Sequence, residues 1–465
     1  MEFRNFTAFP ALAFEGIDQR GEPFHVVALR QTFRLGSGRP ILADDQEPLR
    51  LTDTYFGEVG HGAIREESDL CQFKPKCDVI VIGSAHAPAG RSSPRFTVRL
   101  RVYRPGEPPP LPPPPQGLNP LMSASPEAIH EWRQACKRQR ESEPPGELLI
   151  DKALAILGDR EFRRRSALFR GFAHICRVAS LGLLRPDVWR LTEPQPCDAV
   201  RLTPDRAYGG EHRVLAGNPA ASSVPKGLRL ATGDAVVPGE LVAWTAFAPN
   251  PHGVGWAQGW FLRASNIERI PAPNIEWPSA PIDTALFHSV AAGQADPAAY
   301  REPPGFGVRA KTHPDRAKLI GQADGTFASS DDWLPDGFDF AVWNAAPPDQ
   351  QIDYPSGGEI VELTNLCAPN SWGAGVDEGG NTRLQFALPG DRPFLFVRFE
   401  NGSLGELAAQ LDTIVVDTDR GLLSCVWRAT LAKSPAVRVL EARIIPAEDV
   451  GLSGNREPSV ENAYA

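Results

Sequence analysis

Proline constrains this chain more than any other residue type, because it occupies 46 of the 465 positions, roughly twice its typical share. Proline interrupts helices and is confined in sheets to edges, bulges and turns. We therefore expect many short strands and loops and few long helices. Hydrophobic residues make up 42% of the chain, which is enough for a sizeable core. The length allows two or three domains, or one large β domain with insertions.

Two β-like runs lie near the N-terminus. The second, residues 24–35, ends in strict alternation, in which Leu29, Gln31, Phe33 and Leu35 share one face and Arg30 and Arg34 flank Thr32 on the other. A period of two predicts a strand with one face buried and the other in solvent. A turn around Gly21 would join the two runs as a hairpin.

Further segments also show strand patterns. Residues 78–83 form a continuous β-branched run typical of a core strand, and residues 95–103 alternate. Residues 413–417 and 422–427 flank a short loop typical of a hairpin, and residues 437–445 predict a last strand. The predicted fold is mainly β, with antiparallel sheets in sandwich-like subdomains, long loops rich in proline and glycine, and one inserted helix.

The inserted segment comprises residues 104–147. It contains eight prolines between positions 105 and 115, which favour a stiff polyproline II spacer. A helix over residues 126–141 follows, with Ser125 as its cap, and should be the longest in the chain. We interpret the segment either as a loop with a marginal helix or as a docking arm. The contact residues of such an arm would be Trp132, Lys137, Arg138 and Arg140.

The division into domains is open to two interpretations. The first is a pair of packed β subdomains, residues 1–215 and 216–450, and the second is one large sandwich-like body. Residues 451–465 are polar and predict a disordered tail.

The net charge and the cysteines limit the classes of partner and the cellular compartment that we expect. The net charge of −9 argues against nucleic acid, and weakly against anionic membranes. The seven cysteines are dispersed and include no C-x-x-C pair, which indicates reduced thiols in a cytoplasmic protein. No apolar run has the length of a signal peptide or a membrane span. We expect no membrane association, metal or cofactor.

Common catalytic motifs are absent. The sequence contains neither a phosphate-binding G-x-x-x-x-G-K-[ST] loop nor a G-x-S-x-G nucleophile turn. A zinc motif would need a second histidine four residues after His130, where Gln134 stands. His61 and His86 are more typical of structural or surface residues than of metal ligands.

An alternative hypothesis is a hydrolase or a carbohydrate-binding enzyme. Several carboxylates lie between Asp331 and Asp339, and Trp244, Trp256 and Trp260 would supply a sugar-stacking platform. The spacing of Trp256 and Trp260 places both on one strand face. The competing interpretations are turn-capping aspartates and core or interface tryptophans.

A series of motifs in a particular order carries a resemblance. They are KPKCDVIVIGSAHAP from Lys74, RLTPDRAYGG from Arg201, NP at Asn218, APNIEWPSAPI from Ala272, PPGFGV from Pro303, GTF at Gly325, WLPDGFDFAVWNAAPPDQ from Trp333, GGEIVELTNL from Gly357 and LDTIVVDTDRGLLSCVWR from Leu411. Over roughly residues 20–430, the chain resembles a bacterial family of unknown function whose genes lie beside type VI secretion effector genes. It departs from the family pattern at Ala328, where aspartate is expected, and its insertion at 104–147 is longer than usual.

The resemblance implies a cytoplasmic adaptor or chaperone without catalytic residues. Its expected partners are a cognate secreted effector, recognised through an N-terminal region with a PAAR-like tip domain, and the spike protein VgrG. Exposed strand edges would suit an extended client segment. Polar residues also stand inside otherwise apolar motifs, and we interpret them either as structural hydrogen-bonding groups or as partner contacts. They are Lys74, Asp78, Asn344, Asp349 and Gln350.

Overall fold

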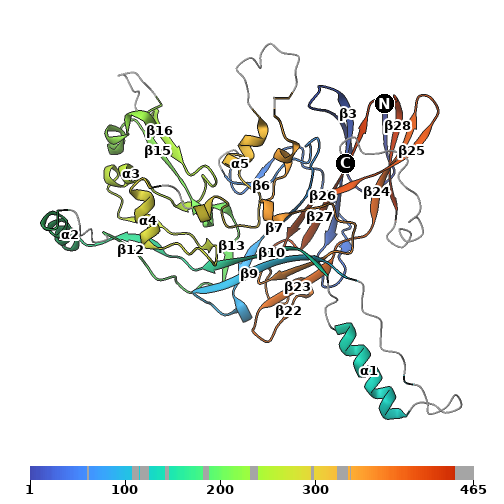
Figure 1. The fold of residues 1–465 in the computed structure, drawn as a ribbon, viewed down its shortest axis with the longest axis horizontal. Coiled ribbons are helices and arrows are strands. Elements are labelled where there is room, and N and C mark those ends of the chain that lie inside the picture. The colour runs from blue at the N-terminus through green and yellow to red at the C-terminus, as the bar shows by residue number, and fades with distance from the viewer. Residues whose placement is uncertain are drawn as a thin grey trace.

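The fold is mainly β with several antiparallel sheets, as the sequence predicts (Figure 1). A computed structural model describes all residues except 60–61, 107–114, 116–124, 142–145, 182–187, 231–238, 295–297, 322–333, 336 and 446–465. The predicted disordered tail, residues 451–465, and the departure at Ala328 therefore lie outside the described residues.

The largest sheet has seven strands. In order across the sheet, they are β2 (Ala11–Ile17), β3 (Pro23–Arg34), β27 (Leu422–Ala432), β26 (Gln410–Asp417), β7 (Cys77–Ile82) and β20 (Gln351–Ile352), with β4 (Ile41–Leu42) paired to β3. All pairs are antiparallel except β26 with β7. The predicted hairpins β2–β3 and β26–β27 are confirmed.

A six-stranded antiparallel sheet lies against the first. Its strands are β19 (Ile275–Glu276), β10 (Glu147–Leu157), β9 (Arg95–Arg104), β21 (Ile360–Thr364), β23 (Thr382–Ala387) and β22 (Gly375–Val376). One hydrophobic cluster contains inward side chains of both sheets, such as Val79 and Ile414 from the first and Leu100 and Leu363 from the second. Both sheets combine strands from either side of residue 215, so a boundary at that residue does not separate them.

Smaller sheets and helices complete the structure. A four-stranded sheet contains β1 (Glu2–Asn5), β28 (Val437–Ile445), β24 (Arg392–Phe399) and β25 (Leu404–Ala408). Short strands are β5 (Thr54–Tyr55), β6 (Ile64–Glu66), β8 (Ser84–His86), β11 (Glu161–Arg164), β12 (Trp189–Leu191), β13 (Ala199–Arg201), β14 (Tyr208–Gly209), β15 (Glu211–Leu215), β16 (Leu241–Ala246), β17 (Val254–Gly255) and β18 (Arg269–Pro271). The α-helices are α1 (Pro126–Glu141), α2 (Ala167–Ala179), α3 (Gly259–Ala264), α4 (Thr284–Ala291) and α5 (Pro314–Ala317).

The inserted segment is confirmed as a connection between neighbouring strands. β9 and β10 pair directly, with Arg104 opposite Glu147, and the helix α1 has the predicted bounds. Figure 1 shows α1 projecting from this end of the sheet.

The half-buried character predicted for residues 24–35 is wrong, because both faces of β3 are covered. Arg30 on the polar face is buried. Its guanidinium lies 2.6 Å from a carboxylate oxygen of Glu66 and 3.1 Å from one of Asp69. A buried cation is tolerated when its charge is paired in this way.

The pairing of Trp256 and Trp260 on one strand face is also wrong. Trp260 belongs to helix α3, and the buried Trp256 precedes that helix. The ring of His212 stacks between Trp256, at 5.0 Å between centroids, and Phe261, at 3.9 Å. Trp244 lies on β16 and donates to Glu211 at 2.7 Å.

The buried His212 predicts an acid-sensitive fold. Desolvation lowers its pKa to about 4, whereas an unfolded histidine titrates near 6.5. As pH falls from about 6.5 towards 4, the unfolded state therefore binds a proton that the folded state does not, and stability is lost. This group alone should lower the free energy of unfolding by about 2–3 kcal/mol at pH 4.5 relative to pH 7. In urea unfolding at pH 7 and pH 4.5, the His212→Gln variant should lose less unfolding free energy on acidification than the wild type. An equal loss in the variant and the wild type would contradict the role given to His212.

The direct pairing of β9 and β10 makes the inserted segment dispensable for folding. Replacing residues 105–146 with Asn-Gly should give a two-residue hairpin loop and change the melting temperature by less than about 4 °C. Thermal unfolding followed by circular dichroism measures this change. A fall above about 10 °C would show that the segment packs against the sheets.

Candidate functional site

Four of the nine motifs that carry the resemblance contribute to the lining of one cavity of about 220 Å³. The lining includes Leu202, Pro204 and Ala207 from one motif, Ile275 from another, and Pro303, Pro304, Gly305, Gly307 and Val308 from a third. Pro347 contributes from a fourth motif. Segments up to about 150 residues apart in the sequence thus form one mostly apolar wall.

A turn around Asn250 shapes one side of this cavity. The buried Asn250 amide donates to the backbone oxygens of Pro204, at 2.8 Å, and Tyr208, at 3.1 Å. Gly209 packs against the same turn with φ +156°, and a Cβ at this position would lie 2.0 Å from the Asn250 oxygen. The Ala-Tyr-Gly-Gly sequence therefore permits close backbone approach.

A buried lysine supports the segment that contributes Pro347. The ammonium of Lys152 on β10 donates to Gln350 at 2.8 Å and to Asp349 at 3.0 Å, and it lies 5.1 Å from the Trp277 ring centroid. Gln350 in turn donates to the backbone oxygens of Val79, at 2.7 Å, and Phe306, at 2.9 Å. Burial lowers the pKa of Lys152, although Asp349 opposes the shift.

Paired charges line the cavity's rim. Arg309 and Glu302 form an ion pair of 2.7 Å, and Lys311 pairs with Asp53 at 2.6 Å. Burial raises the pKa of the Glu302 carboxyl, and Arg309 acts against that shift. His313 lies beside this pair, and its Nε2 atom is 2.6 Å from the Arg301 backbone oxygen. The rim charges are neutralised within the protein, so the cavity mainly offers apolar surface.

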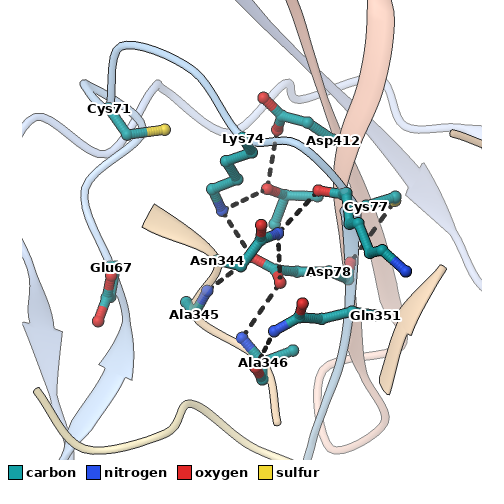
Figure 2. A network of polar contacts seen from close by, with 12 residues as sticks. Glu67, Cys71, Lys74, Cys77, Asp78, Asn344, Ala345, Ala346, Gln351 and Asp412 are labelled. Atoms are coloured by element: carbon teal, nitrogen blue, oxygen red, sulfur yellow. Dashed lines mark hydrogen bonds and ion pairs between the residues drawn. The ribbon is translucent and has the colours of Figure 1, made fainter. Parts of the chain in front are cut away.

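A second buried network fixes β7 to the segment after Asn344 (Figure 2). The Asp78 carboxylate accepts from the Lys74 ammonium at 2.8 Å and from the Asn344 amide at 3.0 Å. It also accepts from the backbone amides of Ala345, at 2.8 Å, and Ala346, at 3.2 Å.

The network continues into the neighbouring strand β26. Lys74 also donates to the Thr413 hydroxyl at 2.8 Å, and that hydroxyl donates to Asp412 at 2.9 Å. Arg428 on β27 donates to Asp412 at 2.6 Å. Burial disfavours the charged form of Lys74, but the nearby acidic groups, Asp78 foremost and then Cys71 and Asp412, together outweigh this effect and raise the pKa of Lys74. The ammonium therefore remains charged inside the protein.

The five polar motif residues meet in these two networks. Lys74, Asp78, Asn344 and Gln350 are buried, while the Asp349 side chain is 45% exposed. Burial and internal bonding fit the structural interpretation and leave only Asp349 accessible to a partner. Lys152 is a buried residue of this site that no motif indicated, and its signal in the sequence is the charged pair Asp151-Lys152 within the otherwise apolar residues 148–157.

The candidates on the inserted segment are described only in part. Helix α1 carries Trp132, which is half-buried, whereas the side chains of Lys137, Arg138 and Arg140 lie outside the described residues. Their role as a docking arm stays a prediction.

The proposed carboxylate cluster is described only in part. Asp331, Asp332 and Asp336 lie outside the described residues. Asp339 accepts from the Ala341 backbone amide at 2.8 Å and caps a short helix, as the turn interpretation expects.

Over the described part of the chain, no group of three or more His, Cys, Asp and Glu side chains is arranged to hold a metal ion. None of the described helices is long and apolar enough to cross a membrane.

The Asp78 network predicts a large loss of stability on truncation. Asp78→Ala would leave the buried Lys74 ammonium and three other donors without their acceptor, which should cost about 3–5 kcal/mol. The matched control is Asp353→Ala, since Asp353 is 90% exposed and 3.9 Å from Lys76. The control should cost less than about 0.5 kcal/mol. Urea unfolding measures both values, and similar losses would contradict the role given to Asp78.

Comparisons with known proteins give a family but no characterised relative. Residues 20–108 and 146–428 match the family described as "Uncharacterized protein conserved in bacteria (DUF2169)". The unmatched residues 109–145 fall within the insertion between β9 and β10. No curated protein and no solved structure matches the chain. Because the matched residues make up most of the sequence, the chain belongs to the DUF2169 family of bacterial proteins.

Proposed function

We propose that this protein is a cytoplasmic adaptor or chaperone for a type VI secretion effector. It binds the PAAR-like N-terminal region of that effector and helps load it onto the VgrG spike. It makes and breaks no covalent bond. Family membership and the resemblance of the ordered motifs support the bacterial context of this role.

The convergence of the motifs on an apolar cavity carries the proposal. Their polar residues bond mainly to one another and to the backbone, which holds the lining segments in place. What faces the cavity is proline, glycine and aliphatic surface with paired charges at the rim. Such a lining suits an apolar side chain of a bound protein segment, since burial of apolar area drives association.

The sheet edges offer a second means of holding a client. β2 and β25 each lie at the edge of a sheet, and β25 carries the exposed Leu404. An edge strand presents backbone donors and acceptors that an extended segment can pair with. The net charge of −9 favours a basic partner surface.

Co-expression tests the proposal. A protein encoded beside this chain's gene, either an effector or a PAAR-like protein, should elute with it as one complex in size-exclusion chromatography. Deleting the gene should lower that effector's solubility or secretion. If every neighbouring effector and PAAR-like protein elutes separately, the adaptor role is wrong.

A pair of glycine variants tests the cavity. A Cβ at Gly305, which lines the cavity, or at Gly227, which lies elsewhere, would meet no atom within 4 Å. Gly305→Leu should fill the cavity and weaken client binding at least tenfold, whereas Gly227→Leu should leave the affinity unchanged. Isothermal titration calorimetry measures both, and unchanged binding by Gly305→Leu would remove the cavity from the binding site.

A further inference from the structure

Helix α2 exposes an apolar stripe. Leu168, Phe172 and Ile175 recur at the spacing of one helix face. Together with two residues that follow, they rank among the most exposed large apolar side chains of the described chain. The five are Leu168, Phe172, Ile175, Val178 and Leu181, with exposed fractions between 59% and 95%.

The opposite face of α2 attaches the helix to the protein. Ala173 is its buried residue, and Arg170 lies 3.4 Å from Glu268 in the ion pair that fixes this face. Ser166 caps the helix by accepting from the Phe169 amide. Figure 1 shows α2 beside β12, away from the two large sheets. The helix is therefore turned with its apolar side outward, the usual mark of a surface that meets a partner.

Gly171 lies within the stripe. It stands three residues after Leu168 and four before Ile175, so these residues share one face. A Cβ at Gly171 would meet no atom within 4 Å. Glycine in a helix interior is less favourable than alanine, and no packing within the described protein requires it here. A glycine on an apolar helix face allows the backbone of a second helix to approach closely.

The charge around α2 identifies the kind of helix that fits. Residues 162–186 contain no aspartate or glutamate, although the whole chain has a net charge of −9. The described arginines among them are Arg163, Arg164, Arg165, Arg170 and Arg177. Glu161 pairs with Arg163, and Glu268 pairs with Arg164 and Arg170, so Arg165 and Arg177 are the charges that face a partner. A partner with carboxylates beside an apolar stripe would complement this region.

Two other occupants fit less well. A second copy of α2 would bring Arg165 and Arg177 of one helix towards the same positive charges of the other. An anionic membrane would meet a protein of net charge −9, and the stripe extends over a helix of only 13 residues.

We propose that α2 is a docking helix that receives an amphipathic helix of the client, with acidic residues bordering its apolar stripe. The two helices cross near Gly171. The identity of the client in this inference rests on the proposed function. The contact between α2 and a client helix is additional to any contact at the cavity.

Serine substitutions at matched positions of the helix test the contact. The probes are the full-length effector and PAAR-like proteins encoded beside this chain's gene, each co-expressed with the full chain. Phe172→Ser and Ile175→Ser should each weaken the complex at least tenfold. The control His174→Ser changes an exposed polar residue of the same helix that does not belong to the apolar stripe, and it should leave affinity within twofold. Because these side chains are exposed, all three variants should unfold at the same urea concentration as the wild type.

Substitutions at Gly171 separate client binding from stability. If this glycine had no role in binding, replacing it would change the stability of the helix but not the affinity for the client. Gly171→Ala should raise the urea midpoint of the free protein, because helix propensity rises and no clash occurs. The same change should weaken client binding about three- to tenfold, and Gly171→Leu should weaken it further. A stabilised variant with unchanged binding would overturn the proposed crossing.

The remaining outcomes separate the two proposals. If a neighbouring protein binds the wild type and the Phe172→Ser variant equally, the docking helix is wrong and the adaptor role stands. If none binds the wild type, both proposals fail. A Phe172-dependent dimer in light scattering would assign the stripe to a second copy. Phe172-dependent sedimentation with vesicles of phosphatidylglycerol and phosphatidylcholine would assign it to lipid. Either result overturns the proposal.

Discussion

The carboxylate of Asp78 holds the structure together at the point where its parts meet. It lies on β7 inside the seven-stranded sheet, and it binds Lys74 together with the backbone of residues 345 and 346. The chain then continues to Gln350, which bonds to Lys152 of the six-stranded sheet. One buried ion pair thus fixes the segment that joins both sheets to the cavity. A buried carboxylate is stable only when its oxygens are satisfied, so this geometry is closely specified.

Strand positions could be predicted from the sequence because alternation reports local structure. The bounds of β28 and α1 agree with the patterns, and the pairing of β9 with β10 follows from the two runs around the insertion. The burial of Arg30 could not be predicted, because its partners Glu66 and Asp69 stand more than 30 residues away, at the end of the short strand β6 and just after it. A strand face that carries charged residues is predicted to lie in solvent unless the segment that covers this face is known.

The same limit applies to the candidate site. The motifs indicated which residues matter, and the polar residues within them do form internal hydrogen bonds. Four of the motifs line one cavity because the tertiary fold brings Pro204, Ile275 and Gly305 to the same wall, which no local pattern records. The outward turn of α2 is likewise a tertiary property. Its apolar spacing alone would predict a buried face, and only the position of Ala173 shows the reverse.

The order of strands in the largest sheet has a consequence for synthesis on the ribosome. The centre of that sheet is the C-terminal hairpin β26–β27, which separates β3 from β7. Until residues 410–432 have left the ribosome, the N-terminal strands β3 and β7 therefore lack the neighbours that stand between them in the finished sheet. During most of synthesis the sheet is therefore incomplete, and its unpaired strand edges favour aggregation. A protein that we propose to be a chaperone would itself be vulnerable while it is being made.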